Sequence, residues 1–126
     1  MPEPTDKPFE LLRRGSVLVV KVAADRMTDM DATDAFNDAL TELLKSEQAT
    51  RWVIDFQRVT FMVTPAINTL VNIAKRIRQR GGVLALTGLN ENISQVFSLM
   101  RLDEVFPIHP DVDAAVEALN RSEPQP

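Results

Sequence analysis

Apolar residues along the chain follow two different spacings. Five short runs rich in Val, Ile, Leu and Phe have the length and composition of strands. Between them, longer segments repeat their apolar residues every third or fourth position, which is typical of helices with one buried face. The predicted strands are residues 9–14, 17–24, 51–56, 83–89 and 105–109. The predicted helices are residues 28–45, 65–80, 91–100 and 112–119.

Each predicted helix carries an apolar face that we expect to be buried. Polar and charged residues occupy the opposite sides, so each helix is expected to pack one face against a sheet. The expected inward residues are Ala32, Ala35, Phe36, Ala39, Leu40, Leu43 and Leu44 in the first helix and Ile67, Leu70, Val71, Ala74 and Ile77 in the second. In the third and fourth they are Ile93, Val96, Phe97 and Met100, then Val112, Ala115, Val116 and Leu119.

Turn and cap residues lie between the predicted segments. Gly15 and Ser16 separate the first two strands by the spacing of a tight hairpin. Gly81 follows the second helix, where glycine commonly ends a helix. Asn90 and Asp111 precede the third and fourth helices, and we expect their side chains to cap them.

The order of elements predicts an α/β fold. Strands that alternate with helices pair mostly in parallel through right-handed crossovers, and the opening hairpin makes the sheet mixed. Pro107 places the last strand at an edge, because proline cannot donate to a strand ladder. We expect one domain with a mixed, mostly parallel sheet of about four to five strands and about four helices. It spans residues 9–120, between Pro-rich polar segments 1–8 and 121–126 that we expect to be flexible.

The composition narrows the function classes. The 126 residues carry a net charge of −4, which argues against binding to nucleic acids or anionic membranes. No apolar run approaches the roughly 18 residues that a membrane span requires, so no membrane insertion is expected. The lack of cysteine excludes disulfides and thiolate metal sites, and it fits a reducing compartment. We expect a cytoplasmic protein, either a monomer or a weak homodimer.

Residues with the chemistry of catalysis are sparse. The single histidine, His109, stands beside Pro110 with no nucleophile and base arranged around it. The sequence has no GxGxxG segment, no Walker A loop and no clustered metal ligands. We therefore expect no cofactor, no metal and no enzymatic activity, and binding is favoured over catalysis.

An ordered series of residues gives the chain a resemblance to a known family. The stretches that carry it are WVIDFQRVTFMVT and a longer segment that begins INTLVNIAKRIRQRGGVLALTGL. From about Phe9 to Leu119 the chain resembles a STAS domain, the fold of bacterial anti-sigma factor antagonists. Asp55 matches the acid that ends an apolar strand in that family. Further matches are Gly81, Gly82, Gly88, Leu89, Leu102, Val105, Phe106, Ala115 and Leu119.

The resemblance also locates a motif in which this chain departs from the family. There, Asp-Ser-small-Gly opens a helix and the Ser is phosphorylated. The corresponding residues here are Val63, Thr64, Pro65 and Ala66. Thr64 keeps a hydroxyl, so the resemblance makes it the candidate phosphoacceptor. Val63 removes the neighbouring carboxylate, and Pro65 removes one N–H donor, which makes the helix start a poorer phosphate cradle.

The function implied by the resemblance is a non-catalytic protein-interaction module in transcription signalling. Antagonists of this type bind an anti-sigma factor that is a GHKL-type serine/threonine kinase. The kinase phosphorylates the helix-start residue, and a PP2C-type phosphatase reverses this. The candidate docking residues are Val63, Thr64, Pro65, Ala66 and Asn68, flanked by Thr28, Asp29 and Asp31. Two alternatives stay open, namely control by phosphorylation of Thr64 and constitutive binding.

Other interpretations of the same residues are simpler. Thr64 as N-cap and Pro65 as first helical residue would form an ordinary helix start. Met62 is expected to be an apolar strand end under the loop, whereas Val63 is either buried there or exposed in a docking patch. Thr28, Asp29 and Asp31 are also cap or first-turn acids for the first helix. At the level of function, the alternative is a STAS subunit of an ABC-type lipid transport system that contacts its ATPase.

Overall fold

The computed structural model describes residues 9–22, 26–27 and 30–121, with residues 26–27, 30–33 and 121 described by their backbone alone. Each predicted strand and helix has a counterpart in it. The strands are β1 (Phe9–Arg14), β2 (Val17–Val22), β3 (Arg26–Met27), β4 (Arg51–Asp55), β5 (Phe61–Met62), β6 (Val83–Thr87) and β7 (Ile108–His109). The helices are α1 (Met30–Ser46), α2 (Thr64–Gln79), α3 (Glu91–Leu99) and α4 (Val112–Arg121), with a 3₁₀ turn, η1, at Leu102–Glu104.

The main sheet has five strands in the order β1-β2-β4-β6-β7. β1 and β2 are antiparallel and the remaining neighbours are parallel, so the predicted mixed sheet is confirmed. The hairpin turn has Gly15 at φ +64, a conformation that a two-residue turn needs at its first position. β3 and β5 form a separate parallel pair that the sequence did not predict.

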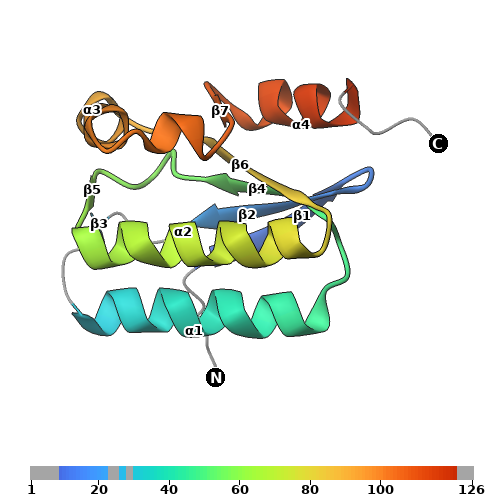
Figure 1. Ribbon diagram of the computed structural model, residues 1–126, viewed down its shortest axis with the longest axis horizontal. Helices are drawn as coiled ribbons and strands as arrows, with labels where there is room; N and C mark the ends of the chain where they lie inside the picture. Colours follow the sequence, from blue (N-terminus) through green and yellow to red (C-terminus); the bar gives the residue numbers. More distant parts are fainter. Residues whose placement is uncertain (1–8, 23–25, 28–29, 122–126) are drawn as a thin grey trace.

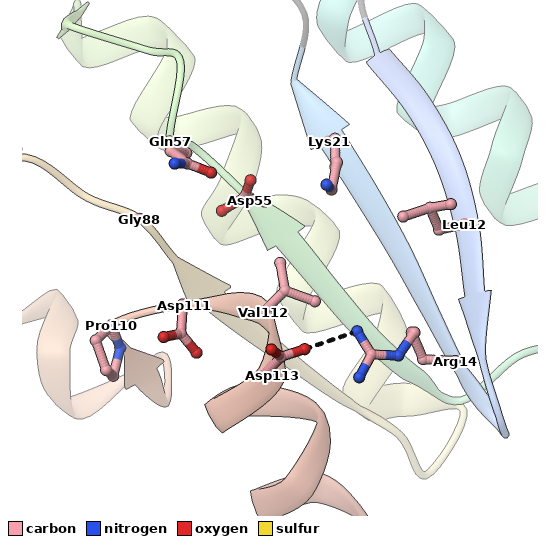
Figure 2. A pocket seen from close by; sticks show the side chains of 10 residues that line it. All are labelled: Leu12, Arg14, Lys21, Asp55, Gln57, Gly88, Pro110, Asp111, Val112 and Asp113. Atoms are coloured by element: carbon pink, nitrogen blue, oxygen red, sulfur yellow. Dashed lines mark ion pairs between the residues drawn. The ribbon is translucent and has the colours of Figure 1, made fainter.

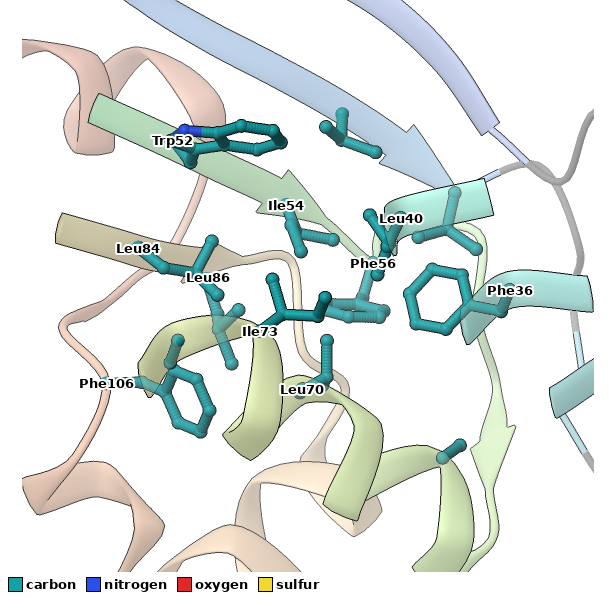
Figure 3. Close-up of a cluster of buried hydrophobic side chains, with 14 of the residues drawn as sticks. Phe36, Leu40, Trp52, Ile54, Phe56, Leu70, Ile73, Leu84, Leu86 and Phe106 are labelled. Carbon is teal, nitrogen blue, oxygen red and sulfur yellow. The ribbon is translucent and has the colours of Figure 1, made fainter. Parts of the chain in front are cut away.

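The two faces of the sheet are covered unequally. Helices α1 and α2 lie side by side over one face, whereas α4 lies over the other (Figure 1). The face under α1 and α2 holds the larger core, in which strand residues such as Trp52 and Ile54 meet Leu40 and Ile73 (Figure 3). The second cluster is smaller and comprises Val17, Val19, Val53, Ala85, Ala115, Val116 and Leu119. One short helix therefore covers less of its face than two long helices cover of theirs.

The predicted helix boundaries depend on caps that the structure confirms. Asn90 Oδ1 accepts a hydrogen bond from Ile93 N at 2.8 Å, and Asp111 Oδ1 accepts one from Ala114 N at 2.8 Å. Beyond the end of α2, Gly81 adopts φ +83, so the predicted stop is also confirmed.

Several predicted inward positions are wrong. Ala35, Val96 and Met100 are exposed, and of Ala32 the structure describes only the backbone. Helix α3 buries only Ile93 and Phe97, because it packs a single row of side chains spaced four residues apart against the end of the core. Val96 belongs to the neighbouring row, which faces outward at 40% exposure.

The last predicted strand, 105–109, is also shorter than expected. Only Ile108 and His109 pair with β6, at the edge of the sheet, where Pro107 contributes its carbonyl oxygen to Leu86 N at 2.9 Å. Val105 and Phe106 instead follow η1, and both of their backbone N–H groups donate to Leu102 O at 2.9 Å. The chain therefore turns through these residues before it joins the sheet.

Candidate functional site

The junction between β5 and α2 carries the candidate site. After β4 the chain makes a turn in which Val59 N donates to Phe56 O at 2.9 Å, and both side chains are buried. Strand β5 then pairs with β3, which fixes the direction in which the chain enters α2. Figure 1 shows β3 and β5 beside the first turn of α2. The site is thus an end of a long helix that the small β3–β5 pair holds in place.

The helix start differs by one residue from the predicted one. Val63 is the N-cap, with φ −90 and ψ 161, and Thr64 is the first helical residue, so the prediction of Thr64 as N-cap is wrong. Val63 O accepts hydrogen bonds from Ala66 N at 3.0 Å and Ile67 N at 3.2 Å. Pro65 moves to the second position, where it is equally tolerated because first-turn N–H groups have no partner within the helix.

This shift changes the chemistry of Thr64. A valine N-cap has no oxygen to offer the first turn, and Thr64 is one residue too late to serve as the cap. Thr64 is exposed, and its hydroxyl makes no hydrogen bond with any residue that the structure describes. The first turn of α2 also contains no acidic residue. A free hydroxyl at the positive end of a helix dipole is therefore presented to solvent.

The other candidate docking residues divide by burial. Pro65 and Asn68 are exposed beside Thr64, and Val63 is half-buried with its side chain packed against the main core. Ala66 is 0% exposed, so it is not part of the surface that these residues present. Its methyl group faces the core because it lies one helical turn before the buried Leu70.

An exposed apolar surface adjoins this helix start, and the sequence did not predict it. Met62 is buried, as expected, while its neighbour Phe61 is 49% exposed. Phe61 and Val96 border a small hollow of about 50 Å³ between β5 and α3. Asn90 holds the two elements together, since its Nδ2 donates to Thr60 O at 3.0 Å. Alternation along β5 was the available signal, because one of two adjacent strand residues must point away from the core.

The remaining flanking candidates are Thr28, Asp29 and Asp31. Thr28 and Asp29 lie outside the described residues, and of Asp31 the structure describes only its helical backbone. In the part of the chain that the structure describes, no group of three or more His, Asp or Glu residues is placed to hold a metal ion. No described helix has the length and apolar character needed to cross a membrane.

The chain belongs to the STAS domain family, whose model matches residues 9–115. Among its relatives is BtrV of Bordetella bronchiseptica, a protein assigned as an anti-sigma factor antagonist. It is 27% identical over 71% of this chain and 83% of that protein. The anti-sigma F factor antagonist of Paenibacillus polymyxa is 23% identical over 91% of this chain and 94% of that protein.

Solved structures show the same fold. A crystal structure from Thermotoga maritima, described as that of an anti-sigma factor antagonist, has a TM-score of 0.78 and 23% identity, covering 90% of this chain and 95% of that one. The Bacillus cell fate determinant SpoIIAA in its phosphorylated form has a TM-score of 0.67 and 16% identity, with coverage of 90% and 97%. The chain is therefore a STAS domain similar to anti-sigma factor antagonists.

Proposed function

We propose that this chain is a non-catalytic antagonist that binds an anti-sigma factor through its α2 docking surface. We define this surface as Phe61, Val63, Thr64, Pro65 and Asn68. The observation that carries the proposal is the exposed Thr64, whose hydroxyl has no described partner, three residues after the exposed Phe61. Protein interfaces are enriched in aromatic residues and also carry direct hydrogen bonds, so an exposed ring and a hydroxyl without a described partner suit a docking surface.

Phosphorylation of Thr64 is the proposed control. A phosphate would bring about −1.5 to −2 charge and three acceptor oxygens into the middle of the α2 docking surface. Next to Phe61 and Val63, a partner surface that is apolar or acidic would lose its contacts or be repelled. The proposed partner is an anti-sigma factor of the GHKL-type serine/threonine kinase class, with a PP2C-type phosphatase to restore the hydroxyl.

Capture of the partner from the source cell tests this function. The tagged full chain is compared with Thr64→Ala, Thr64→Glu and Phe61→Ser, and Thr50→Glu is the matched control. Thr50 is exposed at the other end of α2, where its carbonyl oxygen accepts a hydrogen bond from Val83 N at 2.7 Å. We expect a GHKL-type anti-sigma kinase to bind the wild type, Thr64→Ala and Thr50→Glu. Thr64→Glu and Phe61→Ser should bind it at least about tenfold less, a loss of about 1.4 kcal/mol.

Two outcomes would contradict parts of this proposal. Equal capture by Thr64→Glu and the wild type would show that Thr64 is not part of the docking surface. Capture of a transport ATPase in place of a kinase would favour the transporter-subunit alternative. Incubation of the captured kinase with ATP then separates the two modes of control, since phosphate on a residue other than Thr64 excludes the switch and leaves constitutive binding.

A further inference from the structure

A second hollow lies on the opposite side of the sheet from α2, at the carboxyl ends of β2 and β4. It has a volume of about 340 Å³, and its walls come from β1, the loop after β6 and the first turn of α4 (Figure 2). The hollow exists because α4 packs only over the valines and alanine of the smaller core and begins at Val112. Ligands of open α/β sheets commonly bind at the carboxyl ends of the strands.

The floor of this hollow holds a carboxylate in a fixed position. Asp55 is 5% exposed, and its Oδ1 accepts a hydrogen bond from the buried Thr87 Oγ1 at 2.7 Å. The backbone of Gly88 closes in on the same carboxylate so tightly that an added Cβ would lie 2.8 Å from Asp55 Oδ1 and 2.8 Å from Gln57 N. A buried carboxylate held in this way is a preorganised acceptor for a donor or a cation.

Opposite charges complete the site. Lys21 is aligned with Asp55 in the register of β2 and β4, so both side chains point to the same face of the sheet. Lys21 is half-buried and forms no ion pair with any carboxylate of the described residues, whereas Arg14 is already paired with Asp113 at 2.9 Å. The hollow therefore offers one fixed carboxylate and one ammonium group that lacks a described ion-pair partner.

We propose that this hollow binds a small zwitterionic metabolite of the amino-acid class. The ligand's ammonium would be held by Asp55 and its carboxylate by Lys21. A simple anion fits less well, because Asp111 and Asp113 also line the hollow and would repel it. A volume of about 340 Å³ suits a ligand at the small end of the usual range of binding pockets. This site is separate from the α2 docking surface, so each of the two proposals can be refuted without affecting the other.

Amide chemical shifts of the full chain test the proposal. Each proteinogenic amino acid is added to about 10 mM, which is tenfold above a Kd of about 1 mM. We expect at least one of them to shift the amide signals of Asp55, Gln57 and Gly88 in a saturable manner. Asp55→Asn and Lys21→Met should each weaken this binding at least about tenfold. Lys75→Met, on the exposed side of α2, is the matched control and should leave it unchanged.

A pair of analogues makes the assignment of the two charges specific. The first compound is the amino acid that binds, and the second is the corresponding amine, which lacks the carboxylate. The amine should bind the wild type more weakly than the amino acid does. In Lys21→Met the two compounds should bind equally, because the group that distinguishes them is gone. The proposal is overturned if no amino acid gives saturable shifts, if shifts arise only elsewhere, or if both variants bind as the wild type does. The spectra of Asp55→Asn and Lys21→Met report in the same experiment whether each variant is folded.

Discussion

Replacement of Gly88 by alanine is a strong test of the close packing at the end of β6. Gly88 adopts φ +71, a conformation that residues with a Cβ atom disfavour. An alanine Cβ would also lie 2.8 Å from Gln57 N, 2.9 Å from Gln57 Cα and 2.8 Å from Asp55 Oδ1. The first two atoms belong to the backbone, and the third is held by Thr87, so none of them can move aside freely.

The expected loss of free energy of unfolding in Gly88→Ala has two parts. The same substitution at Gly15 allows them to be measured separately. The left-handed conformation alone costs a non-glycine residue about 1–2 kcal/mol. Forcing extra volume into a well-packed site costs a further 1–3 kcal/mol, roughly. Gly15 has a similar positive φ, +64, but an added Cβ there meets nothing within 4 Å. Gly15→Ala should therefore lose only the first part, and Gly88→Ala should lose both.

Urea unfolding followed by circular dichroism measures both variants. With a slope of about 2 kcal/mol per molar urea, an extra 1–3 kcal/mol lowers the midpoint of Gly88→Ala by roughly 0.5–1.5 M relative to Gly15→Ala. The comparison requires that both variants unfold with the wild-type slope. Equal midpoints for the two variants would show that the loop after β6 yields at little cost, and the description of Asp55 as rigidly held would then be wrong.

Three further substitutions test separate parts of the structure by the same unfolding measurement. Asn90→Ala should lower the free energy of unfolding by about 1–2 kcal/mol, because it removes the cap of α3 and the bond to Thr60 O; no loss would show that the cap is unimportant. Thr64→Ala should change it by less than about 0.5 kcal/mol, because Thr64 is not the N-cap, and a loss near 1 kcal/mol would restore the capping role. Leu70→Ala should cost about 2–5 kcal/mol, because the side chain is fully buried under the sheet, and a loss below 1 kcal/mol would contradict that placement.

The main elements could be predicted because their apolar patterns are long. Runs such as residues 17–22 and the repeating stripe of α2 leave little choice of secondary structure. The β3–β5 pair could not be predicted, since two residues per strand are too few for any periodicity to show. In α3, Val96 lies three residues after the inward Ile93, a spacing that fits burial. It points outward because the core under α3 is narrower than a full helix face, and only tertiary packing determines that width.

The candidate sites could likewise be predicted only in part. The strand-to-helix junction at Thr64 is visible in the sequence, but the position of the cap is not, because proline is tolerated at both the first and the second helical position. The burial of Ala66 follows from the apolar stripe of α2, because Ala66 lies one helical turn before Leu70. The hollow around Asp55 is harder to foresee. The alignment of Asp55 with Lys21 depends on the register of two parallel strands that α1 separates along the chain, and the hollow also depends on where α4 begins.

The unequal coverage of the sheet has a consequence for hydrogen exchange. Helix α4 is held by Ala115, Val116 and Leu119 together with the surface ion pair between Asp113 and Arg14, so it loses fewer buried contacts on opening than α2 does. The amides of α4 should therefore exchange through a local opening. The free energy of that opening should be well below the free energy of global unfolding, which limits exchange in α2. Because Asp113 also lines the hollow above Asp55, any molecule bound there should slow the exchange of α4 more than that of α2. On this lightly covered face of the sheet, binding of a molecule in the hollow is thus coupled to the local stability of α4.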